Sequence, residues 1–108
     1  MDFPDETPPR HYVLNANGEP VPEPNILKWG IFFESANRII KQETIGESLI
    51  STVFLGLDQA FSGPTPILWE TMVFGGHLDQ EQDRCSGWRE QAEAMHARMV
   101  ERVTAFVL

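Results

Sequence analysis

The sequence predicts an α+β fold in which an antiparallel β-sheet of about four to five strands carries two helices packed on one face. Two segments place apolar residues three or four positions apart, as helices do, and between them lie runs rich in Ile, Thr, Val and Phe, which favour strands. Gly, Pro and Asn clusters separate these runs at short intervals, so that neighbouring strands can pair as hairpins. Strands and helices do not alternate as a parallel sheet requires.

The chain of 108 residues suffices for one domain and not for two, because smaller units bury too little surface to offset chain entropy. Residues 1–10 hold three acids and three prolines without apolar periodicity, so we expect an extended N-terminal lead-in there. Residues 11–108 are predicted to form a single α+β domain.

Residues 11–22 are predicted to form a hairpin. Asn17 and Gly18 lie between two short apolar stretches, and this pair supplies the positive φ values that a tight turn needs. The second arm can lie only at a sheet edge, because prolines cannot donate backbone hydrogen bonds to a neighbouring strand. These prolines are Pro20, Pro22 and Pro24.

Residues 26–37 are predicted to form the first helix, with Asn25 as its N-cap. The spacing that indicates the helix is carried by Ile26, Trp29, Gly30, Phe33 and Ala36. Because Leu27, Ile31 and Phe32 widen the apolar side, the helix should be buried over more than half its circumference or should meet a second subunit. Gly30 suggests the close approach of another backbone.

Residues 38–58 are predicted to form two strands that turn near Gly46, and the second arm, 49–57, is apolar on both faces. After a Gly/Pro loop, residues 67–74 return beside that arm, and residues 77–85 form a polar loop or a short edge strand. Ser86 caps a final helix whose apolar stripe comprises Trp88, Ala92, Met95, Met99, Val103 and Phe106. Since helices on one face leave the other apolar face of the sheet in water, we expect a homodimer.

Composition excludes several classes of function. The net charge of -8 repels phosphate groups, so neither direct nucleic-acid binding nor membrane binding is expected. Cys85 is the single cysteine, and the N-terminus has neither the basic start nor the apolar stretch of an export signal. These features predict a cytoplasmic protein.

Glu70 is the first candidate binding residue. In residues 67–74 it alternates onto one side of the strand with Met72 and Phe74, while Trp69, a second candidate, points to the other side. A carboxylate among apolar neighbours is costly unless it is paired, so Glu70 either bonds a base such as Arg38 or Lys41 or lines a polar pocket. We favour the structural pair.

The segment after this strand holds potential metal ligands at alternate positions, namely His77, Asp79, Glu81 and Asp83. Together with Glu90 the three acids match the ligand spacing of a calcium loop, but Arg84 stands where that loop needs glycine. A solvated edge is therefore favoured over a metal site.

Two histidines are further candidate binding residues, His77 in that segment and His96 on the last helix. His96 lies beside Met95 at the border of the buried face, which favours a structural histidine. In a metal-assisted mechanism His96 would instead carry the proton. The spacing of Cys85 and His96 along the chain does not match that of a catalytic cysteine–histidine pair.

The stretch "STVFLGLDQAFSGPTPILWETMVFGG", followed by "RCSGWREQAEAMHARMV", resembles a family of small uncharacterised proteins encoded by bacteriophages and prophages. The resemblance covers roughly residues 38–100. This chain departs from the family pattern at the loop of residues 63–66 and at Met95, where the family has glycine. The resemblance implies a phage-encoded accessory protein in the host cytoplasm, and it supplies no catalytic residue.

No P-loop, G-x-S-x-G elbow or zinc-type cysteine pair occurs in the chain. The function that we predict is therefore that of a small phage-encoded, non-enzymatic binding protein. It would act as a homodimer on a host protein, for example in interference with host defence, or on a small-molecule ligand, and it would need no cofactor. The alternative is a small metal-assisted hydrolase that uses the acidic segment of residues 77–83.

Overall fold

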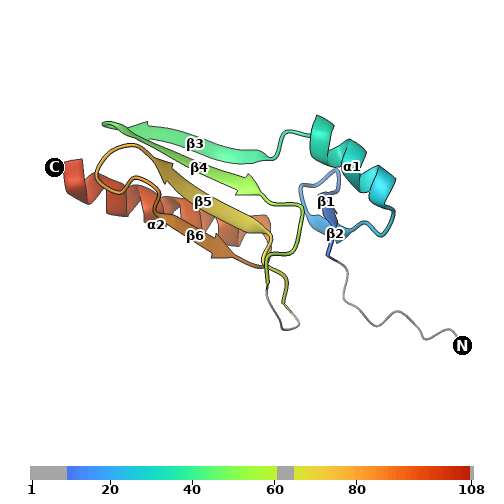
Figure 1. The fold of residues 1–108 in the computed structure, drawn as a ribbon. Helices are drawn as coiled ribbons and strands as arrows, with labels where there is room; N and C mark the ends of the chain where they lie inside the picture. The colour runs from blue at the N-terminus through green and yellow to red at the C-terminus, as the bar shows by residue number, and fades with distance from the viewer. Residues whose placement is uncertain (1–9, 61–64, 108) are drawn as a thin grey trace, which may run out of the picture.

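The computed structural model describes residues 10–60 and 65–107, and it confirms the α+β class (Figure 1). The described residues form two helices and six strands in two antiparallel sheets, of two and four strands. In chain order the elements are β1 (Tyr12–Leu14), β2 (Pro20–Pro22), α1 (Ile26–Ser35), β3 (Ile39–Ile45), β4 (Ser48–Phe54), β5 (Trp69–Phe74), β6 (Gln82–Cys85) and α2 (Arg89–Val107). Residues 1–9 of the lead-in expected at residues 1–10 and part of the Gly/Pro loop lie outside the described residues.

The predicted N-terminal hairpin and the cap of α1 are both present. β1 pairs with β2, Gly18 has a φ of 76°, and the Asn15 side chain accepts hydrogen bonds from the backbone of Asn17 and Glu19 within the turn. The Asn25 side chain accepts from the first free N–H groups of α1, those of residues 27 and 28. These short-range bonds explain why the local sequence was sufficient to predict both features.

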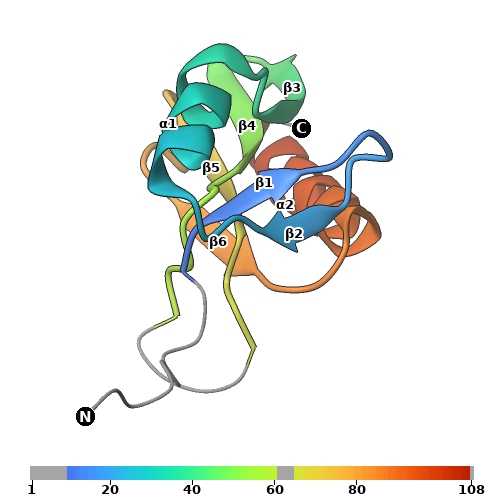
Figure 2. The same cartoon turned by 90° about the vertical axis from the view of Figure 1, so that its right-hand side faces the viewer.

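The larger sheet is an antiparallel meander in the order β3-β4-β5-β6, and α2 contacts all four of its strands (Figure 2). Side chains of β4 and β5 that share the inner face meet the apolar side of α2 in the core. The buried apolar residues are Ile50, Phe54, Leu68, Trp69, Val73, Ala92, Met95, Met99 and Val103. Trp88 and Phe106, expected in the apolar stripe, are instead more than half exposed at the two ends of the helix.

Only α2 covers the inner face of the sheet, and the expectation that both helices pack there needs correction. α1 contacts β1 and lies beyond one end of the sheet (Figures 1 and 2). The Trp29 Nε1 donates to the Gly56 carbonyl at 2.8 Å, and this bond holds α1 beside the segment that follows β4. α1 reaches the core at this end of the sheet, where the ring of Phe32 lies edge-on to that of Phe54 with centroids 6.1 Å apart.

The outer face of the sheet is less apolar than the sequence suggested. The register places polar side chains between the apolar ones, with Ser51 opposite Met72, Val53 opposite Glu70, and Glu70 opposite Arg84. Such a mixed face can remain in water, so it does not by itself require a second subunit. Within the described part of the chain, no helix is both long and apolar enough to cross a membrane.

Candidate functional site

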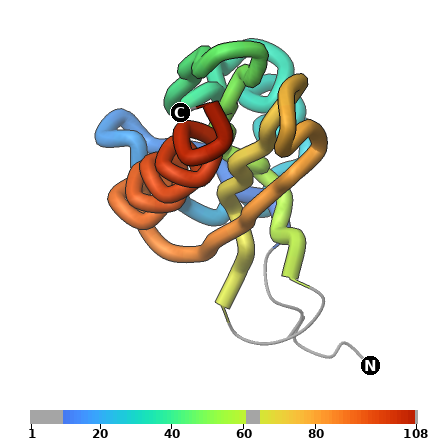
Figure 3. Tube along the Cα trace, turned by 90° about the vertical axis from the view of Figure 1, so that its left-hand side faces the viewer, coloured from blue at the N-terminus to red at the C-terminus, as the bar shows by residue number. Residues whose placement is uncertain are grey.

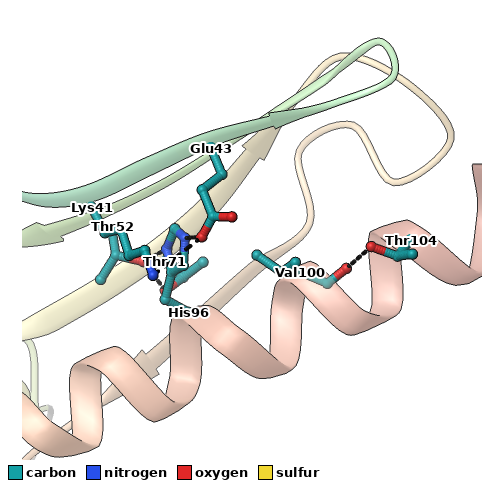
Figure 4. Close-up of polar contacts among 7 residues, drawn as sticks. All are labelled: Lys41, Glu43, Thr52, Thr71, His96, Val100 and Thr104. Atoms are coloured by element: carbon teal, nitrogen blue, oxygen red, sulfur yellow. Dashed lines mark hydrogen bonds and ion pairs between the residues drawn. The ribbon is translucent and has the colours of Figure 1, made fainter.

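A chain of polar side chains crosses the core between β3, β4, β5 and α2 (Figure 4). His96 of α2 is only 1% exposed, and its Nδ1 lies 2.6 Å from the Thr52 Oγ1. Thr52 Oγ1 lies 2.6 Å from the Thr71 Oγ1, and the His96 Nε2 lies 2.9 Å from the Glu43 Oε1. We call these four residues the polar chain.

The donors of the polar chain follow from the chemistry of Glu43. An ionised carboxylate can only accept, so the His96 Nε2–H donates to Glu43. In neutral His96 the Nδ1 then accepts from the Thr52 hydroxyl, which in turn accepts from the Thr71 hydroxyl. Each buried polar atom thereby has a partner, and none of the buried side-chain N or O atoms that the structure describes is left unpaired.

An acid, a histidine and a hydroxyl linked by hydrogen bonds also occur in nucleophilic active sites. Here the buried position of these groups indicates a structural role instead. Thr52 and Thr71 are fully buried, and neither lines the pockets at the end of the sheet, beside β6 or beside the first hairpin. A nucleophile needs space beside it for the reacting atom. His96 therefore joins helix to sheet, in line with the structural role that its place in the sequence favoured.

The contact with His96 makes Glu43 sensitive to acid. The hydrogen bond from His96 lowers the pKa of the Glu43 carboxyl below its ordinary value of 4.5, against the opposing effect of burial, and Lys41 lowers it further. A carboxyl whose pKa is lower in the folded state contributes stability above its unfolded pKa and loses it as the pH falls through the folded pKa.

We expect Glu43→Gln to flatten the acid limb of the stability profile, because glutamine cannot be protonated in this range. The measurement is urea unfolding of both proteins from neutral pH to below 4.5. The wild-type protein should lose more stability than the variant as the pH falls below 4.5. Parallel profiles for the two proteins would contradict the contribution assigned to Glu43.

Glu70 has a structural partner, as favoured, but the partner is neither Arg38 nor Lys41. The Arg84 Nε donates to the Glu70 Oε2 at 2.7 Å across the β5–β6 pair. Lys41 instead pairs with Glu43 at 3.5 Å, and Arg38 lies over the Phe33 ring, 3.8 Å from its centroid. A salt bridge this close to solvent contributes at most about 1 kcal/mol.

Trp69, the other candidate on β5, is fully buried and donates its Nε1–H to the Gly87 carbonyl at 3.0 Å. A side chain in this position cannot touch a ligand on the surface. Its role is to fill the core.

The acidic segment does not converge on a metal site. The Asp79 Oδ1 accepts from the Gly75 backbone at 2.6 Å, and Glu81 pairs with Arg102 at 2.9 Å. Asp83 lies in the edge strand β6 opposite Thr71, while His77 stacks on Phe106. Across residues 10–60 and 65–107, no three His, Cys, Asp or Glu side chains are grouped so as to hold a metal ion. The hydrolase alternative therefore gains no support from the geometry.

Cys85 is not activated as a nucleophile. Its thiol is half-buried, and this burial, with a smaller contribution from Asp83, raises the pKa of the thiol against the opposing effect of Arg98. A raised pKa keeps the thiol protonated, and the thiolate is the reactive form. Both ring nitrogens of His96 are bonded elsewhere, so His96 is not available as its base.

His77 is the candidate binding residue that lines a pocket at one end of the molecule. The β3–β4 turn, the β5–β6 loop and the last turn of α2 meet at one end of the molecule (Figure 3) and enclose about 450 Å³. We call this space the end pocket. Sequence reasoning missed two of its side chains, Glu47 and Phe106, as functional candidates. In the sequence, the signal was the glycines at 46, 75 and 76. In the structure all three have positive φ values and lie where the loops approach each other.

A second surface feature is the outward side of α1. Leu27 and Ile31 are 76% and 69% exposed, although they lie one turn apart on a ten-residue helix. No residue of α1 is fully buried, so the helix is less covered within the chain than its apolar content predicts.

Comparison with protein-family models, with curated proteins and with solved structures gave no match.

Proposed function

We propose that the chain is a non-enzymatic binding protein that works as a homodimer, joined through the outward side of α1. The observation that carries the proposal is the exposure of Leu27 and Ile31 side by side on this helix. Burial of two such side chains contributes about 1.5–3 kcal/mol each. Ile26, also more than half exposed, extends the apolar surface toward the start of the helix.

Gly30 supports a helix-to-helix contact at this surface. The sequence suggested that another backbone approaches Gly30, yet a Cβ placed there would meet no atom within 4 Å. Gly30 lies one turn from both Ile26 and Glu34 and beside Ile31, so the space above it belongs to the same surface. A second copy of α1 is the occupant that fits, because two identical apolar helix faces are self-complementary about a two-fold axis.

The chemistry of the interior favours binding over catalysis. The hydroxyls and the imidazole of the polar chain are bonded to one another in the core, where they stabilise the fold. Binding would thus use surfaces, namely those of the dimer and its loops. With the resemblance to phage-encoded proteins, this describes an accessory protein whose partner is a host protein or a small ligand.

The first test is the mass in solution, measured by light scattering after gel filtration at tens of micromolar. The wild-type chain should have twice the monomer mass of 12.3 kDa. Leu27→Gln combined with Ile31→Gln should yield a monomer of unchanged fold, because glutamine removes the apolar contact and keeps helix propensity.

Phe74→Gln is the matched control. Phe74 is an exposed apolar side chain on the outer face of the sheet, and its replacement should leave the dimer intact. A wild-type monomer would overturn the proposal. If the dimer survived the α1 double substitution but was lost in Phe74→Gln, the interface would lie on the outer face of the sheet.

A further inference from the structure

The end pocket is a half-open hollow, and two of the loops that form it contact each other directly. A Cβ on Gly76 would lie 2.1 Å from the Ser48 Oγ, and one on Gly75 would lie 2.5 Å from the Glu47 carbonyl oxygen. The β5–β6 loop therefore rests directly on the β3–β4 turn. The volume of about 450 Å³ lies in the range of about 300–1,000 Å³ that is typical of small-molecule sites.

The charge in the end pocket is negative. Among the described residues that line it, Glu47 is the only acidic one; it is exposed to solvent, and its carboxylate forms no ion pair with any described residue. The pocket also adjoins the C-terminal end of α2, where the helix dipole carries partial negative charge. The last turn of α2 contains no basic side chain that would offset this charge.

The rest of the lining is apolar and aromatic. Leu78, Val103 and Val107 contribute aliphatic surface. The His77 ring stacks on the Phe106 ring with centroids 4.2 Å apart and an angle of 22° between the planes. Phe106 is more than half exposed, so its ring can still be approached from the solvent side. An aromatic face beside a carboxylate is a setting that attracts organic cations.

We propose that the end pocket binds an organic cation, an ammonium group joined to an apolar body. The Glu47 carboxylate and the end of α2 attract the ammonium group, and Phe106 with the aliphatic lining contacts the apolar body. The Ser48 hydroxyl donates to the Gly75 carbonyl at 2.9 Å, so its proton is not available to a ligand in the pocket. This site lies on elements other than α1, so it is independent of the proposed dimer.

The probe is benzyltrimethylammonium, titrated into the full-length protein at neutral pH and low ionic strength and followed by the backbone amide resonances. Benzyl alcohol and phenylacetate serve as neutral and anionic probes with the same ring. The cation should shift amides in the β3–β4 turn, residues 75–78 and the last turn of α2, and it should bind more tightly than either comparison probe.

Glu47→Gln should weaken the binding of the cation about five-fold, as expected for loss of one partly solvated charge. Glu101→Gln is the matched control, since Glu101 is an exposed acid on α2 outside the pocket lining and its replacement changes the net charge equally. Unchanged melting temperatures would show that both variants fold.

Four results would overturn the inference. Benzyl alcohol could bind as tightly as the cation, which would make the site merely apolar. Glu47→Gln and Glu101→Gln could lose affinity equally, which would show that the cation responds to the net charge of the protein and not to the pocket. The shifted amides could lie outside the three segments of the pocket, or no amide could shift at all.

Discussion

Trp69→Ala should lower the free energy of unfolding by about 3–5 kcal/mol, the range for removing a large aromatic side chain from a core. Trp69 is fully buried, and its ring packs on that of Phe54 with centroids 5.0 Å apart. It also lies in the core cluster that joins β4 and β5 to α2, so the lost contacts cannot be replaced by local movement alone. Urea unfolding followed by far-ultraviolet circular dichroism measures the loss.

Trp88→Ala is the control for this change, because it removes the same side chain from a position that is 53% exposed. It should alter stability by no more than about 0.5 kcal/mol. Since Trp69→Ala can leave too little folded protein to measure, Trp69→Phe gives a milder test. It keeps most of the apolar surface and loses the bond to Gly87, at a cost of about 1 kcal/mol from that bond. Equal losses for Trp69→Ala and Trp88→Ala would contradict the core position of Trp69.

Thr52→Val should lower the free energy of unfolding by about 2–6 kcal/mol, because two buried polar groups lose a partner at about 1–3 kcal/mol each. The groups are the Nδ1 of His96 and the hydroxyl of Thr71, both of which lie 2.6 Å from the Thr52 Oγ1. Valine matches threonine in shape and strand propensity, so packing and backbone are preserved. The loss therefore reports on the hydrogen bonds, and urea unfolding at neutral pH measures it.

Thr71→Val makes the same chemical change one strand away and provides the comparison. Thr52 would lose one bond and keep its bond to His96, so the cost should be about 1 kcal/mol. The polar chain thus predicts a larger loss at residue 52 than at residue 71. Equal losses for the two valine variants, or a larger loss for Thr71→Val, would show that the chain does not run through Thr52.

The sequence by itself determined the local features of this protein. The N-terminal hairpin, the Asn25 cap, the strand segments and the amphipathic α2 formed, because each depends on groups within a few residues of one another. Two details differ from the prediction: of the turn pair only Gly18 has a positive φ, and α2 begins at Arg89 rather than directly after Ser86. The face of β5 that carries Glu70, opposite to that of Trp69, also followed from simple alternation along the strand.

Only the tertiary structure decided which of these residues meet. Glu70 pairs with Arg84 rather than Arg38 or Lys41, because β6 lies beside β5 while β3 is two strands away. The bond between Glu43 and His96 joins positions 53 residues apart, and the end pocket joins two loops to the last turn of a helix. The place of α1 beside β1 was likewise decided by tertiary contacts. Periodicity reports which side of an element is apolar, but strand order, register and helix placement come from long-range packing that no local pattern encodes.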